Sequence, residues 1–202
     1  MKTVGLVIGL AASLACGAAN ATVFAYNVVL NGANEAPVNA SPGTGYARVT
    51  INDITWTLDV DASFRDLIGL TTAAHIHAAT AIPFTGVSRV ATEVPSFPHF
   101  PTGVTHGAFQ EHYDLTLLNS YNPAFANANG GTALSAAGAL LQAAQTGRAY
   151  LNIHTRAFPA GEIRGFLTPV PETSSWALMI AGFVTIGAFM RLRHRSAAVS
   201  AV

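Results

Sequence analysis

The stretch RAYLNIHT at residues 148–155, followed after a short link by GEIRGF at residues 161–166, decides the fold. Successive side chains of a strand point to opposite faces, so Tyr150, Asn152 and His154 share one face. The residues between them, which are mostly apolar, share the other face. The link contains a proline and a glycine, which are common in turns. The pattern therefore predicts a β-hairpin with one apolar face and one hydrogen-bonding face.

A second polar landmark, AHIH at residues 74–77, lies much earlier in the chain. If this segment is a strand, His75 and His77 point to the same side of it. A sheet can bring His154 beside them, and three imidazoles suit a zinc or copper ion. The arrangement is similar to that of the copper-zinc superoxide dismutases, which carry a His-x-His pair on a strand of a Greek-key barrel. It lacks their cysteine pair and a second complete ligand set, so a metal-binding module or metalloenzyme is one interpretation.

A buried polar network is the alternative interpretation of the same residues. Buried polar groups are tolerated when each finds a hydrogen-bond partner. Asn152, Glu162 and Arg164 are the structural partners that such a network offers to the histidines. No cofactor is required in that case, whereas the first interpretation requires Cu or Zn.

Alternating apolar and polar residues predict several further strands. A helix is expected to begin at Thr132 or Ser135, to continue through Ala144 and to end at Gly147. No alternation of strands and helices occurs, so we expect an all-β fold, a Greek-key β-sandwich or flattened barrel with one short helix. The expected strands outside the hairpin cover residues 22–30, 45–51, 54–62, 73–77 and 111–117.

Composition excludes several classes of function. Residues 22–168 contain six arginines, no lysine and nine acidic residues, a balance that argues against nucleic-acid binding. The one cysteine, Cys16, precedes this region, and the chain has no Gly-x-Ser-x-Gly motif. Nucleophilic catalysis is therefore not expected, and no catalytic residue is assigned.

Both ends of the chain carry patterns typical of export. Residues 1–21 have the charged start, apolar run and small-residue ending of a secretory signal peptide. Residues 173–190 are free of charge, and at about 1.5 Å per residue they can cross a bilayer core. The arginines that follow should stay cytoplasmic, and they are Arg191, Arg193 and Arg195. The expected segments are a signal peptide (1–21), a β domain (22–168), a sorting segment (169–195) and a cytoplasmic tail (196–202).

The two polar landmarks together resemble the CHRD domain, which is named after chordin. The motifs AHIH and YLNIHT…GEIRG carry the resemblance, together with Asn34 and Glu35 in an NEAPV loop. The resemblance covers residues 22–168. It implies a family signature at Asn34 and Glu35, although an acidic residue in a loop most often is solvated or caps the loop, and we expect that of Glu35.

The C-terminal pattern resembles the PEP-CTERM sorting signal. Pro171 and Glu172 stand before the apolar segment and the arginine-rich tail, as in that signal, while Thr173 replaces its usual second proline. The resemblance implies recognition by an exosortase, and the N-terminal pattern implies action of a signal peptidase during export. An ordinary membrane anchor is the alternative.

These features lead to two expectations for function. The first is an exported, non-enzymatic surface or matrix protein with a structural or adhesive domain, anchored transiently in the membrane and then located at the cell surface or outside the cell. Its expected partners are the exosortase, the signal peptidase, the membrane and extracellular polysaccharide. The second is the Cu or Zn module described above.

Overall fold

The computed structural model describes residues 23–171, 179–187 and Arg191. The expected signal peptide at residues 1–21 lies outside this range, as do Glu172, Arg193 and Arg195. Pro171 and Arg191 are both exposed, and residues 179–187 are helical. In these described parts of the chain, no helix has the length and apolarity needed to cross a bilayer. The expected membrane segment at 173–190 extends over residues outside the described range.

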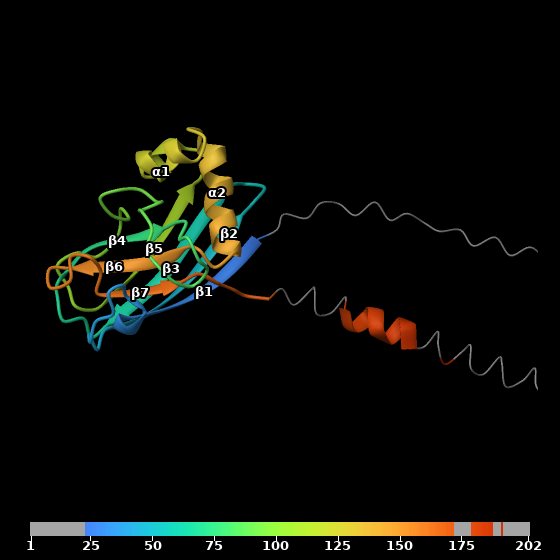
Figure 1. Ribbon diagram of the computed structural model, residues 1–202, viewed down its shortest axis with the longest axis horizontal. Coiled ribbons are helices and arrows are strands. Elements are labelled where there is room, and N and C mark those ends of the chain that lie inside the picture. Colours follow the sequence, from blue (N-terminus) through green and yellow to red (C-terminus); the bar gives the residue numbers. More distant parts are fainter. Residues whose placement is uncertain (1–22, 172–178, 188–190, 192–202) are drawn as a thin grey trace, which may run out of the picture.

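The structure is mostly β, and its strands form one antiparallel sheet that curls into a half-barrel (Figure 1). The strand order is β4-β6-β7-β1-β2-β3-β5, with β8 pairing with β1. In Figure 1, β6 and β7 cross the direction of β1, β2, β3 and β5, which shows the curl. The predicted β class is confirmed in the form of a single curled sheet. The strands are β1 (Val23–Asn31), β2 (Thr44–Asn52), β3 (Thr57–Arg65), β4 (Thr71–His77), β5 (Gly107–Asp114), β6 (Tyr150–Thr155), β7 (Ile163–Phe166) and β8 (Thr168–Pro169).

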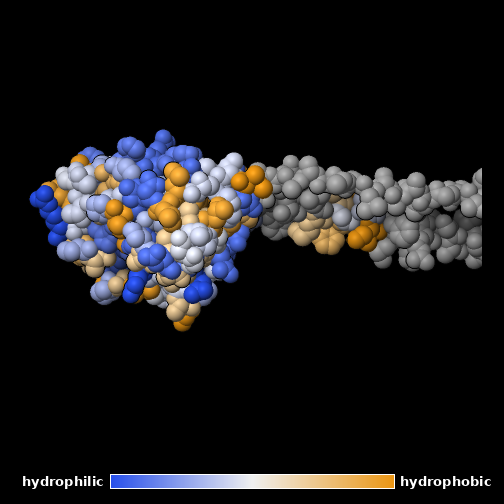
Figure 2. Space-filling model, turned by 90° about the horizontal axis from the view of Figure 1, so that it is seen from above, coloured by the Kyte–Doolittle hydropathy of each residue, from blue (hydrophilic) through white to orange (hydrophobic). Residues whose placement is uncertain are grey.

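The core takes alternate side chains of β1, β2, β3 and β5, whereas β4, β6 and β7 are buried along most of their length. In β3, Leu58, Val60 and Phe64 are buried, while Asp59 and Asp61 between them are exposed. The period of two that the sequence predicts is thus confirmed in this strand. On the face of the domain seen in Figure 2, hydrophobic residues are scattered among hydrophilic ones.

Two α-helices accompany the sheet, where one was expected. They are α1 (Pro123–Ala128) and α2 (Ala133–Gln145), and two short 3-10 turns, η1 (Gly32–Asn34) and η2 (Leu118–Ser120), precede them. The one helix expected from the sequence is α2, and α1 was not predicted, although its start carries two helix signals. Asn122 caps the helix by accepting a hydrogen bond from the backbone of Ala124, and Pro123 occupies its first turn.

The expected helix is confirmed as α2, which packs its alanine- and leucine-rich face into the core. The side chains of Thr132 and Ser135 each accept a hydrogen bond from the backbone N–H of the other residue. Gly147 follows at a φ of 68°, a left-handed conformation that glycine adopts without steric cost. The helix therefore begins and ends where its capping residues require.

Replacing Thr132 by alanine should lower the free energy of unfolding by about 1 kcal/mol, because the first turn of α2 loses its capping oxygen. Urea denaturation measures this change. Leu134→Ala, at a site that is 55% exposed in the same turn, is the control and should stay within about 0.5 kcal/mol of wild type. Equal losses in both variants would contradict a specific capping role.

The long irregular segment between β4 and β5 runs along the outer edge of β4. Ala91 donates a backbone hydrogen bond to Ile76 (2.8 Å), Phe97 donates to Ala74 (3.1 Å), and Gly103 donates to Thr71 (2.8 Å). An uncovered strand edge can pair with other chains, so this segment protects β4. It also places its own carbonyl groups beside the histidines of β4.

Candidate metal centre

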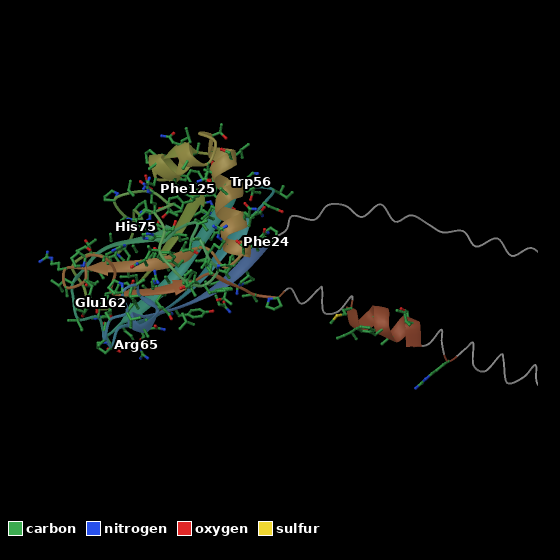
Figure 3. All side chains as sticks on the ribbon, viewed as in Figure 1. Phe24, Trp56, Arg65, His75, Phe125 and Glu162 are labelled. Carbon is green, nitrogen blue, oxygen red and sulfur yellow. The ribbon has the colours of Figure 1, made fainter. Side chains whose placement is uncertain are left out.

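The pairing of β4 with β6 brings the three predicted histidines together. His75 stands directly opposite Asn152, and Ala73 stands opposite His154. Because side chains two residues apart share a face, His75, His77 and His154 occupy one side of this strand pair. One ring nitrogen from each histidine lies within 4.8 Å of one from each of the others. The centre is located in the half of the domain away from Phe24 (Figure 3).

Each histidine ring is fixed by a backbone carbonyl. Nε2 of His75 lies 2.6 Å from the carbonyl oxygen of Pro95, Nδ1 of His77 lies 2.9 Å from that of Ser88, and Nδ1 of His154 lies 3.0 Å from that of Pro159. A carbonyl oxygen only accepts hydrogen bonds, so these nitrogens must carry the proton. The second nitrogen of each neutral ring then has a free lone pair. These nitrogens are His75 Nδ1, His77 Nε2 and His154 Nε2, all buried and without a hydrogen-bond partner.

The protonation state of the histidines suits metal binding. Burial lowers the pKa of His75 and that of His77 to about 4, and it also lowers the pKa of His154. All three rings are therefore neutral at pH 7. Neutral imidazole held by a hydrogen bond from its other nitrogen is the usual form of a histidine ligand.

The dimensions of the centre fit a transition-metal ion after a small adjustment. Zinc–nitrogen bonds are about 2.0–2.1 Å long, so two nitrogens on one ion are at most about 4.2 Å apart. One ring nitrogen of each histidine lies within 4.8 Å of one from each of the other two. Movements of a few tenths of an ångström in each ring therefore suffice to close the set around one ion.

Arg164 and Tyr150 support the centre from the side of β7. The ring of Tyr150 stacks on that of His77 with 4.7 Å between centroids, and the Arg164 guanidinium lies 4.8 Å from the Tyr150 ring centre. Arg164 also donates hydrogen bonds to the carbonyls of Asn34 and Gly86. The NEAPV loop is therefore fixed directly to the sheet that carries the histidines.

Glu35 is buried, in contrast to the solvated position expected from its loop. It is only 6% exposed, and its Oε2 lies 3.8 Å from Nε of Arg164. Burial raises the pKa of its carboxyl group to about 7, although Arg164, the backbone of Ala36 and the Asn152 amide all act to lower it. The expectation of a solvated Glu35 was wrong because Arg164, 129 positions later in the chain, draws the loop onto the sheet.

At pH 8, metal-free Glu35→Gln should be more stable than metal-free wild type by about 3 kcal/mol. The folded pKa is raised from 4.5 to about 7, so the stability that the protonated carboxyl contributes is lost as the pH rises through 7. Glutamine keeps the uncharged form at every pH, and the difference should vanish below pH 4.5. Urea denaturation at both pH values measures it, with Asp61→Asn on the exposed face of β3 as control. A less stable variant at pH 8 would show that the ion pair with Arg164 outweighs the cost of burial.

Glu162 belongs to a separate cluster on the β3–β4 side. Its carboxylate accepts hydrogen bonds from Ser41 Oγ (2.6 Å), Thr155 Oγ1 (2.7 Å) and the backbone N–H groups of Ile68 (2.5 Å) and Gly69 (3.0 Å). The structure therefore brings Asn152 and Arg164 beside the histidines but directs Glu162 elsewhere. The polar network expected from the sequence grouped all of these residues. The separation of Glu162 from the histidines was therefore not predicted.

The carbonyl groups that fix the histidines were missed by sequence reasoning. They belong to Pro95, Ser88 and Pro159, in loops whose sequence carries no periodicity. A backbone oxygen has no residue type to identify it, so no sequence signal could have located these contacts.

Comparison with known proteins gives one family. The family model described as "CHRD domain" matches residues 26–167. Neither the search of curated proteins nor the search of solved structures gave a match. The matched range covers the sheet apart from the first three residues of β1 and the whole of β8, and it includes the three histidines.

Proposed function

The chain belongs to the CHRD domain family, and from this premise we propose that its domain is a metal-binding module that holds one zinc or copper ion with His75, His77 and His154. The observation that carries the proposal is the convergence of three histidine rings, each of which has one buried nitrogen without a hydrogen-bond partner. A buried polar atom without a partner costs about 1–3 kcal/mol, so a purely structural network would be expected to satisfy these atoms. A metal ion satisfies all three at once.

The donor set favours zinc or copper over the hard cations. Calcium and magnesium take oxygen ligands, whereas imidazole suits zinc and copper. The second ring nitrogen of each histidine already donates to a carbonyl, as in established histidine–metal sites. The module is therefore equipped with ligands and with the contacts that orient them.

Metal analysis of the purified protein tests this proposal. We expect about one equivalent of bound Zn or Cu after equilibration and dialysis, and a Kd at least about tenfold weaker in His77→Gln, since even supporting residues of metal sites are worth that much. His112→Gln is the matched control, because His112 is an exposed histidine whose Nδ1 lies 2.6 Å from Asp59. Absence of bound metal from the wild-type protein would reject the proposal. Equal metal affinities of His77→Gln and His112→Gln would reject it as well.

We also propose that the module works outside the cytoplasm, as a surface or matrix protein without enzymatic activity. The pattern at residues 1–21 supports export, and Pro171 and Glu172 before an apolar segment support sorting by an exosortase. The absence of a nucleophile motif from the sequence of the domain supports a binding or adhesive role. Extracellular polysaccharide is the partner that such a location suggests.

Intact-mass measurement of the surface-exposed protein tests this location. Loss of residues 1–21 together with the segment after Glu172 is the expected result. A mature protein that retains the apolar segment would indicate an ordinary anchor and would contradict exosortase sorting. Recovery of the intact chain from the cytoplasm would contradict export.

A further inference from the structure

We propose that the ion in this centre keeps one coordination position open for water or a small inorganic anion, and that Asn152 orients this exogenous ligand. This inference rests on the proposed metal site and extends it from storage of an ion to binding of a small ligand on that ion. The contacts of Asn152, the number of protein ligands and the burial of the centre each support it.

The number of ligands is the first observation. Among the residues that the structure describes, the histidine group contains three members and no carboxylate or thiol within reach. Structural zinc sites are closed by four protein ligands, whereas sites that bind exogenous ligands have three and leave the fourth position to water. Three histidines therefore correspond to an open site.

The position of Asn152 is the second observation. It stands opposite His75 in the β4–β6 pair and two residues before His154, so its side chain shares the face of the histidines. It is 2% exposed, and its Oδ1 is buried without a hydrogen-bond partner. A water molecule on the ion has protons to donate, and this oxygen is an acceptor on the same face.

A second unpartnered acceptor lies close to the first. Glu35 Oε1 is also buried without a partner. A Cβ atom placed on Gly161 would be 2.5 Å from Asn152 Oδ1 and 2.7 Å from Glu35 Oε1, so both oxygens pack against Gly161 and a side chain at this position would displace them. Two buried acceptors beside Gly161 thus have no donor from the protein, and a small molecule bound on the ion can supply one.

Burial limits the size of the ligand. His75 and His77 are 6% and 8% exposed and lie against the segments that contain Pro95 and Ser88, while the half-buried His154 lies against Pro159. A ligand of two or three atoms can enter by small movements of these loops, whereas a polymer or a large metabolite cannot. The ligand class is therefore water, hydroxide and small anions, for which azide is a suitable probe.

Azide binding to the Cu(II)-loaded full-length protein tests the inference. Metal content is measured first, then water-proton relaxation, then the absorption and electron paramagnetic resonance changes on titration with azide. We expect relaxation enhancement from an exchanging water and one azide per ion. We expect about tenfold weaker azide binding in Asn152→Ala at unchanged copper content, as for other residues that support a metal site. Asn27→Ala on β1 is the matched control and should bind azide like wild type.

The outcomes separate the two proposals. Absence of bound copper would refute the proposed metal site itself. One copper per chain without relaxation enhancement or azide binding would leave the metal site intact and refute the open position. Equal azide affinity in wild type and Asn152→Ala would refute the role of Asn152. The relaxation measurement uses wild type alone, so it decides on the open position even if the variant fails to fold.

Discussion

Lowering the pH from 7 to 4 should destabilise the metal-free protein by several kcal/mol, through His75 and His77. Burial lowers their folded pKa from 6.5 to about 4, so the unfolded chain binds protons between these values while the folded protein does not. The stability that the two neutral rings contribute is therefore complete above pH 6.5 and is lost as the pH falls toward 4. A shift of this size corresponds to about 3 kcal/mol for one histidine. The two contributions are not independent, because their rings are 5.9 Å apart.

Urea denaturation of the metal-free Glu35→Gln variant measures the histidine contribution without the opposing contribution of the Glu35 carboxyl. The Glu35 carboxyl changes stability in the opposite direction over part of the same pH range, and glutamine removes that contribution. Adding His75→Gln should flatten the dependence between pH 4 and 6.5, whereas adding His112→Gln should leave it unchanged. An equally steep dependence after His75→Gln would show that the buried histidines do not cause the loss.

Replacing Glu162 by alanine should lower the free energy of unfolding by about 3–5 kcal/mol, the largest single-residue loss that we expect in this domain. Its carboxylate is fully buried and accepts four hydrogen bonds. Truncation leaves the N–H groups of Ile68 and Gly69 and the hydroxyl of Thr155 without their acceptor. The loss is expected to reach the β3–β4 link, since Glu162 holds that link against β7.

Measuring the stability of Glu162→Gln against pH separates the contribution of the negative charge from that of the side-chain shape. Burial raises the pKa of Glu162, but the hydrogen bonds from Ser41, Thr155, Ile68 and Gly69 outweigh burial and leave the pKa lowered from 4.5. The stabilisation is therefore present above pH 4.5 and declines as the pH falls through the lowered value. The difference between wild type and Glu162→Gln should shrink in that range when measured by urea denaturation. Asp61→Asn on the exposed face of β3 is the control, and a constant difference between wild type and Glu162→Gln at all pH values would contradict a role for the charge.

The sequence predicted those parts of the molecule that depend on local periodicity. Alternation along β3 and β6 gave the strands and their faces, and the spacing of His75 and His77 gave their common side. The position of His154 beside His75 and His77 could not be predicted from periodicity alone, because it depends on which strands pair in the sheet. The similar histidine arrangement of a Greek-key barrel suggested such a neighbour, and the β4–β6 pairing provides it.

The rest depended on contacts between distant segments, which local patterns do not record. Glu162 was grouped with Arg164 because they are two residues apart, yet its partners Ile68 and Gly69 lie more than ninety positions earlier in the chain. Glu35 was expected in solvent because its loop is polar, yet Arg164 covers it. In both cases a buried charge found its partner across the sheet, where tertiary packing overrides the tendency of the local sequence.

The pairing of β8 with β1 places the two ends of the domain side by side. Val170 donates a backbone hydrogen bond to Ala25 (2.8 Å), next to the start of β1. A domain whose ends nearly touch tolerates circular permutation, because a short linker can join them and new ends can open in an exposed turn. A permutant that joins Val23 to Val170 and opens between Ile54 and Thr55 would keep the whole histidine centre within one continuous segment. It would also allow the domain to be inserted as a unit into a surface loop of a carrier protein.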